Sequence, residues 1–204
     1  MSMKKQGAKK PVGVLLAAYG SPRSLDEVPG YLKDIKRGQE PSTELIHKIT
    51  ERYERIGGKT PLYEITEADL SGLQLLIDKE EGEGEYLVFT GMKHWHPYIR
   101  DVIREELQNI RALICLALAP HYSSISIGGY IRQFDEGRAS APNMPAHVVR
   151  SWHTNSFFIS CIQEQLLHAV KKQEGRGEPH VIFTAHSLPA RIKQEGDPYE
   201  EELL

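Results

Sequence analysis

The stretch Val12-Gly13-Val14-Leu15-Leu16-Ala17-Ala18 decides the fold class, because it has the character of a strand buried on both faces. The run is short and apolar throughout, and it closes in the polar turn Tyr19-Gly20-Ser21-Pro22. A continuous apolar run of this kind is typical of a parallel sheet, whereas a strand with one solvated face alternates. We therefore expect residues 12–18 to form a strand covered on both sides.

Further runs of the same kind follow along the chain. The strand candidates are residues 86–90, 112–119, 147–150 and 181–185. Each is short and apolar and is followed by a turn or helix signal. Strands that alternate with helices predict an α/β fold, in which a parallel sheet carries helices on both faces.

Three amphipathic helices are expected between these strands. The first has apolar residues on one face from Leu45 to Ile56 and ends at Gly57-Gly58, a common C-terminal signal. The second opens at Thr66, with Asp69 three residues later. The third begins at Pro97, since proline is favoured in the first turn of a helix.

One stretch, residues 133–145, is rich in Gly, Ser and Pro and is typical of a linker. We therefore expect a basic tail at 1–10, a first α/β domain at 11–145 and the beginning of a second at 146–204. Asp197-Pro198 opens a last helix shortly before the sequence stops. The second domain is then too short to close a core, which predicts a truncated form of a two-domain protein.

Composition excludes several classes of function. The 204 residues are 40% hydrophobic and 26% charged, which allows a real core, and the net charge of −3 argues against nucleic-acid binding. No run approaches the roughly 18 apolar residues of a membrane span, and no apolar signal core is present, so we expect a cytoplasmic protein. The two cysteines, Cys115 and Cys161, form no disulfide framework and are expected to be reduced thiols or metal ligands.

Polar and aromatic clusters follow the carboxyl ends of several predicted strands. They are Tyr19-Gly20-Ser21-Pro22, Lys93-His94-Trp95-His96, Ala119-Pro120-His121-Tyr122-Ser123 and Ala185-His186-Ser187-Leu188-Pro189. The carboxyl ends of parallel strands meet at one edge, so we expect the clusters to converge on one crevice. His186, at the end of the run 181–185, is a candidate site residue, and a structural histidine is the alternative.

These clusters together resemble the ferrochelatases. The likeness covers nearly the whole chain in the family's order, and it includes four more motifs: Ile35-Lys36-Arg37-Gly38, Arg52-Tyr53-Glu54, Gly57-Gly58-Lys59-Thr60-Pro61-Leu62 and Gly196-Asp197-Pro198-Tyr199. The resemblance implies two Rossmann-like, chelatase-type α/β domains, the second only partly present here. It also implies a lyase of haem and porphyrin biosynthesis that inserts ferrous iron, its substrate metal, into a porphyrin.

By this resemblance, His186 is the catalytic residue and the ligand of the ferrous iron. A neutral imidazole can donate a lone pair to iron or accept a pyrrole proton, because its unperturbed pKa lies at about 6.5. In the family this histidine works with a glutamate from the later second domain, and no matching segment occurs in these 204 residues. The alternative is therefore a non-catalytic porphyrin- or haem-binding module that lacks the glutamate half of the site.

Tyr19 resembles the tyrosine of the Gram-positive-type enzymes that act on coproporphyrin III, where its oxygen is an axial ligand to the product iron. A tyrosine that only packs at a strand end is the alternative. The resemblance also implies substrate contacts from five residues: Lys36, Arg52, Tyr53, Thr60 and Tyr130. Lys36 stands where many relatives have Arg, and lysine lacks the bidentate fork of arginine. Thr60 stands where many relatives have Ser, and threonine keeps the hydroxyl. A solvated helix face is the alternative for Arg52.

Cys161 closes the segment Phe157-Phe158-Ile159-Ser160-Cys161, which resembles the ferrochelatases that hold a [2Fe-2S] cluster with three cysteines from a C-terminal extension. A buried small hydrophobe is the alternative. The spacing of His94, Trp95, His96 and His121 fits no metal site, so these residues are expected to shape the pocket. Expected partners are coproporphyrin III and downstream enzymes of the haem pathway. A chelatase of another tetrapyrrole, such as sirohydrochlorin, is a weaker rival.

Overall fold

The computed structural model describes residues 9–175 and 177–204. The chain forms two compact units, one of residues up to 118 together with 129–149, the other of residues 119–128 and 150–204. Most of the expected basic tail lies outside the described residues. Of its lysines, Lys9 and Lys10 are described, and the Lys9 Nζ lies 3.9 Å from Glu85 Oε2 in an ion pair.

The first unit contains a parallel sheet whose central strand is the run that decided the fold class. The strands are β1 (Val12–Ala18), β2 (Tyr86–Met92), β3 (Ala112–Ala117) and β4 (Ala146–Val149), in the order β2-β1-β3-β4. Every residue of β1 is buried, as the continuous apolar run predicts. All three pairings are parallel, which confirms the α/β expectation.

The position of β4 corrects the expected start of the second domain. Ala146 pairs with Leu113 of β3, so residues 146–149 form an edge strand of the first sheet. The predicted linker at 133–145 is also partly wrong, because helix α5 (Ile127–Gly137) continues to Gly137. Its buried Ile127, Tyr130 and Phe134 recur at helical spacing, and this apolar stripe outweighs the turn-forming residues near its end.

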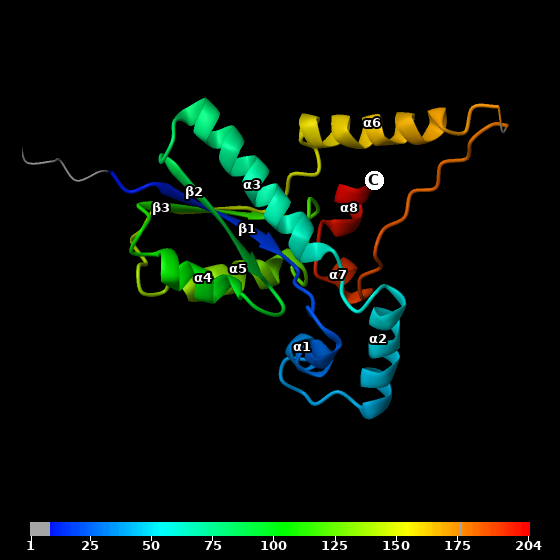
Figure 1. The fold of residues 1–204 in the computed structure, drawn as a ribbon, viewed down its shortest axis with the longest axis horizontal. Helices are drawn as coiled ribbons and strands as arrows, with labels where there is room; N and C mark the ends of the chain where they lie inside the picture. The colour runs from blue at the N-terminus through cyan, green and yellow to red at the C-terminus, as the bar shows by residue number, and fades with distance from the viewer. Residues whose placement is uncertain (1–8, 176) are drawn as a thin grey trace, which may run out of the picture. The chain divides into compact units, whose positions relative to one another are not determined.

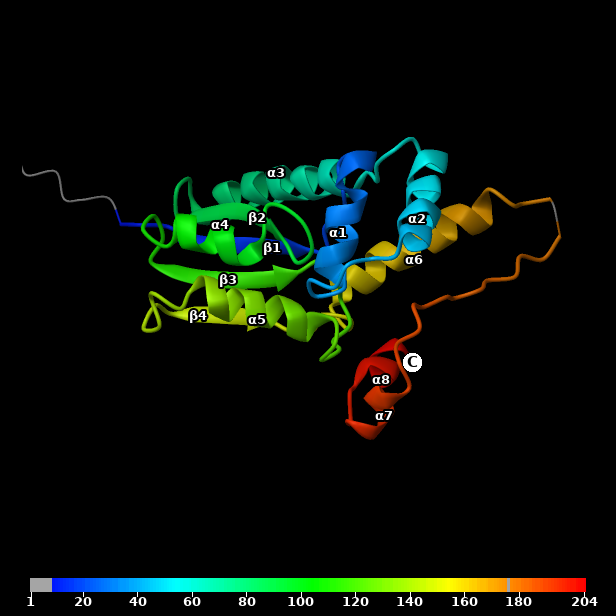
Figure 2. The same cartoon turned by 90° about the horizontal axis from the view of Figure 1, so that it is seen from below.

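Helices cover both faces of the sheet, α3 (Leu62–Glu81) on one and α4 (Ile99–Glu106) with α5 on the other (Figures 1 and 2). Under α3, Leu70, Leu73 and Ile77 pack against Val14, Leu16 and Val88. On the opposite face a Cβ added at Gly91 would lie 2.9 Å from the Ile99 Cα, so glycine permits the close approach of α4. None of the helices in the described part of the chain is long and apolar enough to cross a membrane.

Helix α3 begins four residues before the predicted start. Pro61 occupies its N-cap, and Thr66 lies inside the helix with its Oγ1 donating to the carbonyl oxygen of Leu62 at 2.7 Å. Thr66 therefore satisfies its hydroxyl within the helix instead of capping it.

Between β1 and α3 lie two helices, α1 (Val28–Ile35) and α2 (Thr43–Arg55), after a short 3₁₀ turn at Leu25–Glu27. Helix α2 ends before Gly57 and Gly58, both with left-handed φ of +89° and +88°, as the sequence predicts. At its start the Ser42 side chain accepts a hydrogen bond from the Leu45 amide.

The second unit holds the helices α6 (Ser156–Lys171), α7 (Arg191–Gln194) and α8 (Tyr199–Leu203). The predicted strand at 181–185 is wrong: residues 177–189 have no regular secondary structure, and Ile182 and Phe183 are 83% and 79% exposed. A strand needs a partner for its backbone groups, and the described residues of this unit contain no other strand. The run is apolar as predicted, but no strand among the described residues of this unit pairs with it.

Asp197 organises the start of α8. Its Oδ2 accepts hydrogen bonds from the Ser124 amide at 2.7 Å, the Ser124 hydroxyl at 2.8 Å and the Ser123 hydroxyl at 3.0 Å. Its Oδ1 accepts from the Tyr199 amide at 3.1 Å. These bonds lower the pKa of Asp197, although desolvation, the largest single contribution, acts to raise it. The carboxylate therefore joins the loop before α5 to the terminal helices.

A substitution at Leu15 tests whether β1 lies in the centre of the core, because the Leu15 side chain is fully buried. We expect Leu15→Ala to lower the free energy of unfolding by about 2–5 kcal/mol, through lost apolar transfer and the cavity left behind. The control Leu75→Ala lies on α3, where the leucine is 72% exposed, and should change stability by no more than about 0.5 kcal/mol. Urea unfolding followed by circular dichroism compares them. Equal midpoints for both variants would contradict this packing.

Candidate active site

Two of the predicted clusters meet at the carboxyl edge of the sheet, after β1 and β2. The Lys93 amide donates to the Ala18 carbonyl at 2.9 Å, and the His94 amide donates to the Tyr19 carbonyl at 2.7 Å. Gly20 has φ +89°, and a Cβ there would lie 1.7 Å from the His94 carbonyl oxygen. Only glycine allows this approach, which explains the Tyr-Gly pair at the turn.

Tyr19 stands at this edge with its side chain half-exposed. Its ring centroid lies 4.8 Å from the His94 imidazole, and the Lys93 Nζ lies 5.6 Å from the same ring. Burial, with a smaller contribution from the Asp34 charge, raises the pKa of Tyr19. The phenol is therefore protonated near neutral pH, and a strong Lewis acid is required to take its oxygen as a phenolate.

Three more tyrosines surround this turn, Tyr31 on α1, Tyr53 on α2 and Tyr130 on α5. The Tyr31 hydroxyl donates to the Gly20 carbonyl at 3.3 Å, and Tyr31 and Tyr53 share a side-chain hydrogen bond. Burial is the largest cause that raises the pKa of each of the three. Tyr31 and Tyr130 are buried, so Tyr19 and the half-buried Tyr53 supply the accessible aromatic surface of this edge, which suits a flat apolar ligand with polar substituents.

His94 is held by an acidic partner from α1. Its Nδ1 lies 2.6 Å from Asp34 Oδ1, and the Tyr98 hydroxyl donates to the other oxygen of Asp34 at 3.1 Å. Burial lowers the pKa of His94 and outweighs the hydrogen bond to Asp34. A neutral ring that Asp34 orients agrees with the expectation that His94 shapes the pocket.

Lys93 belongs to a predicted cluster, but the sequence indicated no separate role for it. Its Nζ lies between two aromatic rings, 5.6 Å from the Tyr19 centroid and 5.3 Å from the Tyr130 centroid. Burial, followed by the charges of Arg132 and Arg37, lowers the pKa of Lys93 to about 8. Its place directly after a predicted strand was the available signal, but the arginines come from distant segments.

Three other predicted substrate contacts, Thr60, Lys36 and Arg52, differ in how exposed they are to solvent. Thr60 Oγ1 lies 2.8 Å from Ser21 Oγ, which ties the Gly-Gly-Lys-Thr segment to the turn after β1. Lys36 is half-buried at the end of α1. Arg52 is exposed in the last turn of α2, and its side chain makes no ion pair with any residue that the structure describes.

The remaining clusters, at 119–123 and 185–189, belong to the second unit. Tyr199 connects them, since its hydroxyl donates to the His186 carbonyl at 3.0 Å and its ring lies 6.4 Å from that of His121. The His186 side chain is exposed in the irregular segment. Because the strand before it is absent, His186 does not lie at a strand end, and its predicted role rests on the motif alone.

Cys161 is the one expected cluster ligand within this sequence, and its role as a ligand stays a prediction. It is exposed on α6, which rules out the buried-hydrophobe alternative, and Gln165 Nε2 donates to its sulfur at 3.6 Å. Cys115 is buried in β3, where burial raises the pKa of its thiol to about 12. A [2Fe-2S] cluster needs four ligands, and no group of three or more metal-ligating side chains occurs among the described residues. The residues present do not fit such a cluster.

A parallel sheet with helices on both faces and an aromatic, hydroxyl-rich site at its carboxyl edge defines a ligand-binding α/β protein of the Rossmann-like class. The chain belongs to the ferrochelatase family, because the family model described as ferrochelatase matches residues 11–204.

The chain is also similar in sequence to curated ferrochelatases. The chain is 40% identical to a ferrochelatase of Herpetosiphon aurantiacus over 195 residues, covering 94% of this chain and 64% of the relative. It is 37% identical to a ferrochelatase of Deinococcus radiodurans over 203 residues, covering 96% and 62%. It is 34% identical to the coproporphyrin III ferrochelatase of Halalkalibacterium halodurans over 196 residues, covering 96% and 63%. The chain thus spans less than two thirds of the length of these relatives.

Proposed function

We propose that this chain carries the porphyrin-binding half of a ferrochelatase that inserts ferrous iron into coproporphyrin III and yields coprohaem. The observation that carries the proposal is the placement of Tyr19 at the carboxyl edge of the sheet, beside His94 and Lys93. Relatives named coproporphyrin III ferrochelatase support the substrate. The reaction is placed in the cytoplasm, and later enzymes of haem biosynthesis take the product.

The proposed substrate matches the chemistry of this edge. A porphyrin is flat and apolar, and Tyr19 with the half-buried Tyr53 offers aromatic area for it. Coproporphyrin III carries four propionates, for which Lys36 and Arg52 supply charge and Thr60 supplies a hydroxyl. Lysine at position 36 contributes a point charge without the planar fork of arginine, so its propionate contact is less directional.

Metal insertion requires that the porphyrin lose its pyrrole protons as the iron–nitrogen bonds form. We assign to the His186 imidazole the transfer of iron or the acceptance of a pyrrole proton, because its neutral form has one available lone pair. Tyr19 is assigned as the axial ligand of the product iron. Its pKa is raised by burial, so the iron must displace the phenol proton when the product forms.

The exposed position of His186 favours a second candidate function for these 204 residues, that of a porphyrin-binding module without turnover. Fluorescence quenching by added coproporphyrin III measures binding, and anaerobic incubation with ferrous iron measures insertion. Binding with insertion, and preference for coproporphyrin III over protoporphyrin IX, supports the enzyme. Binding without insertion identifies the module, and absence of binding overturns both.

Arg52 tests the contact with propionate. We expect Arg52→Ala to weaken coproporphyrin III binding by about 1.5- to 5-fold at low salt, as for an exposed ion pair. The difference from the wild-type protein should narrow as salt rises, because mobile ions screen the charge. Arg55→Ala, in the same exposed last turn of α2, is the control. Equal affinities for Arg52→Ala and Arg55→Ala at low salt would remove Arg52 from the site.

A further inference from the structure

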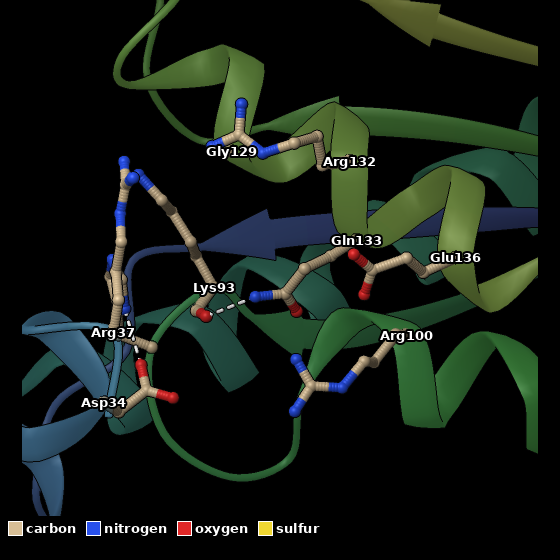
Figure 3. Close-up of a pocket in the computed structure, with 9 residues that line it drawn as sticks. Asp34, Arg37, Lys93, Arg100, Gly129, Arg132, Gln133 and Glu136 are labelled. Atoms are coloured by element: carbon tan, nitrogen blue, oxygen red, sulfur yellow. Dashed lines mark hydrogen bonds and ion pairs between the residues drawn. The ribbon is translucent and has the colours of Figure 1, made fainter. Parts of the chain in front are cut away.

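A cavity of about 430 Å³ in the first unit is lined partly by Lys93 and His94 of the candidate active site (Figure 3). The end of α1, the loop after β2 and helices α4 and α5 line it. Its charged lining residues are Asp34, Arg37, Lys93, Arg100, Arg132 and Glu136. Four cations therefore face two carboxylates, and the resemblance assigns no role to this cavity.

One of the two carboxylates, that of Asp34, is bound by groups other than the arginines. Asp34 accepts hydrogen bonds from His94 and Tyr98. Arg100 lies 3.8 Å from Asp101 in an ion pair and stacks on the Tyr98 ring at 4.4 Å. For Arg37 and Arg132, no ion pair is found within residues 9–175 and 177–204. Two arginines that form no ion pair with a described residue therefore lie at this end of the cavity.

Figure 3 shows the side chains of Arg37 and Lys93 ending close together, with Arg132 projecting from α5 toward the same end. Arg37 and Arg132 are near enough that their charges depress the Lys93 pKa. Gathering like charges in this way costs free energy, which an anion between them offsets.

The fold holds Lys93 firmly in this position. Its carbonyl oxygen accepts a hydrogen bond from Gln133 Nε2 at 2.6 Å. A Cβ added at Gly129 would lie 2.5 Å from the Lys93 Cε, so glycine lets α5 pass directly over the lysine stem. The backbone at Arg37 is held by its amide, which donates to the Asp34 carbonyl at 2.8 Å. The stem of Lys93 is therefore positioned before any ligand arrives, which reduces the entropy lost on binding.

We propose that Arg37, Lys93 and Arg132 form a binding site for an oxyanion, a carboxylate or a phosphate. The planar guanidinium groups can each donate two parallel hydrogen bonds to such a group, and the ammonium adds a point charge. The Lys93 amine also contacts the rings of Tyr19 and Tyr130, so the anion lies at the border of the candidate active site. Two sources supply this chemistry: a carboxylate of the bound tetrapyrrole, which rests on the proposed function, or a free small anion, which does not.

Calorimetric titration with inorganic phosphate at low ionic strength tests the site without any catalytic readout. We expect saturable binding to the whole chain that Arg132→Gln and Lys93→Met each weaken by roughly 5- to 10-fold. Arg132 is exposed on α5, so its substitution spares the core. Arg104→Gln is the matched control, because Arg104 is exposed on α4, pairs with Asp101 at 2.9 Å and lies outside the cavity.

Competition then identifies the source of the anion. If saturating phosphate weakens coproporphyrin III binding to the wild-type chain but not to Arg132→Gln, a tetrapyrrole carboxylate occupies the site. If phosphate and coproporphyrin III bind independently, and Arg132→Gln affects phosphate alone, the ligand is a free anion. The proposal is overturned if neither substitution changes the affinity for phosphate or for coproporphyrin III. The phosphate titration involves no porphyrin. Its result therefore stays valid even if the proposed ferrochelatase function is wrong.

Discussion

His186→Ala is expected to lower iron insertion into coproporphyrin III by about 10²- to 10⁴-fold, the range for loss of a group that transfers a proton in the reaction. Porphyrin affinity should stay nearly unchanged, because macrocycle binding depends on buried area and propionate contacts. The measurement is the initial rate of insertion under anaerobic conditions, beside fluorescence titration of the same variant. Both measurements use the natively expressed protein. Its mass is first compared with the 23.1 kDa of the 204-residue chain.

His180→Ala is the matched control for this prediction. His180 and His186 are both exposed in the irregular segment 177–189, so general disturbance of that segment should affect both variants alike. A loss of turnover confined to His186→Ala supports a role in the reaction. Near-normal turnover by His186→Ala would show that the histidine is structural and would remove it from the proposed reaction.

Tyr19→Phe is expected to abolish the tyrosinate-type absorption band of the iron product. Phenylalanine keeps the ring that contacts His94 and Lys93 but lacks the only atom able to bind iron. The spectral change therefore reports coordination and not altered packing. Insertion itself should persist, because the proposed role of His186 does not depend on the phenol oxygen.

Tyr86→Phe is a control for this spectrum. Tyr86 begins β2 and pairs with Val12, so it lies at the amino ends of the strands, whereas Tyr19 follows the carboxyl end of β1. The wild-type and Tyr86→Phe products should have the same band. An unchanged spectrum in Tyr19→Phe, or a clear preference for protoporphyrin IX over coproporphyrin III, would contradict the coproporphyrin assignment. Membership of the ferrochelatase family would be unaffected by either result.

Local patterns determined a large part of this fold. The run 12–18 predicted a strand buried on both faces, and the glycines at 57 and 58 predicted the end of α2. Both features depend on periodicity and on backbone freedom within a few residues, which a sequence displays directly. The convergence of Tyr19 with Lys93-His94 was also predictable, because parallel strands must end at the same edge.

Tertiary structure alone decided the features that depend on partners distant in the chain. The apolar run 181–185 looked like a strand, yet a strand exists only where another backbone pairs with it, and β4 joined the first sheet because β3 offered that pairing. The cationic cavity likewise needs Lys93 from the end of β2, Arg37 from α1 and Arg132 from α5. Each is an ordinary basic residue in the sequence, because electrostatic coupling depends on distance through space and on burial, neither of which local pattern records.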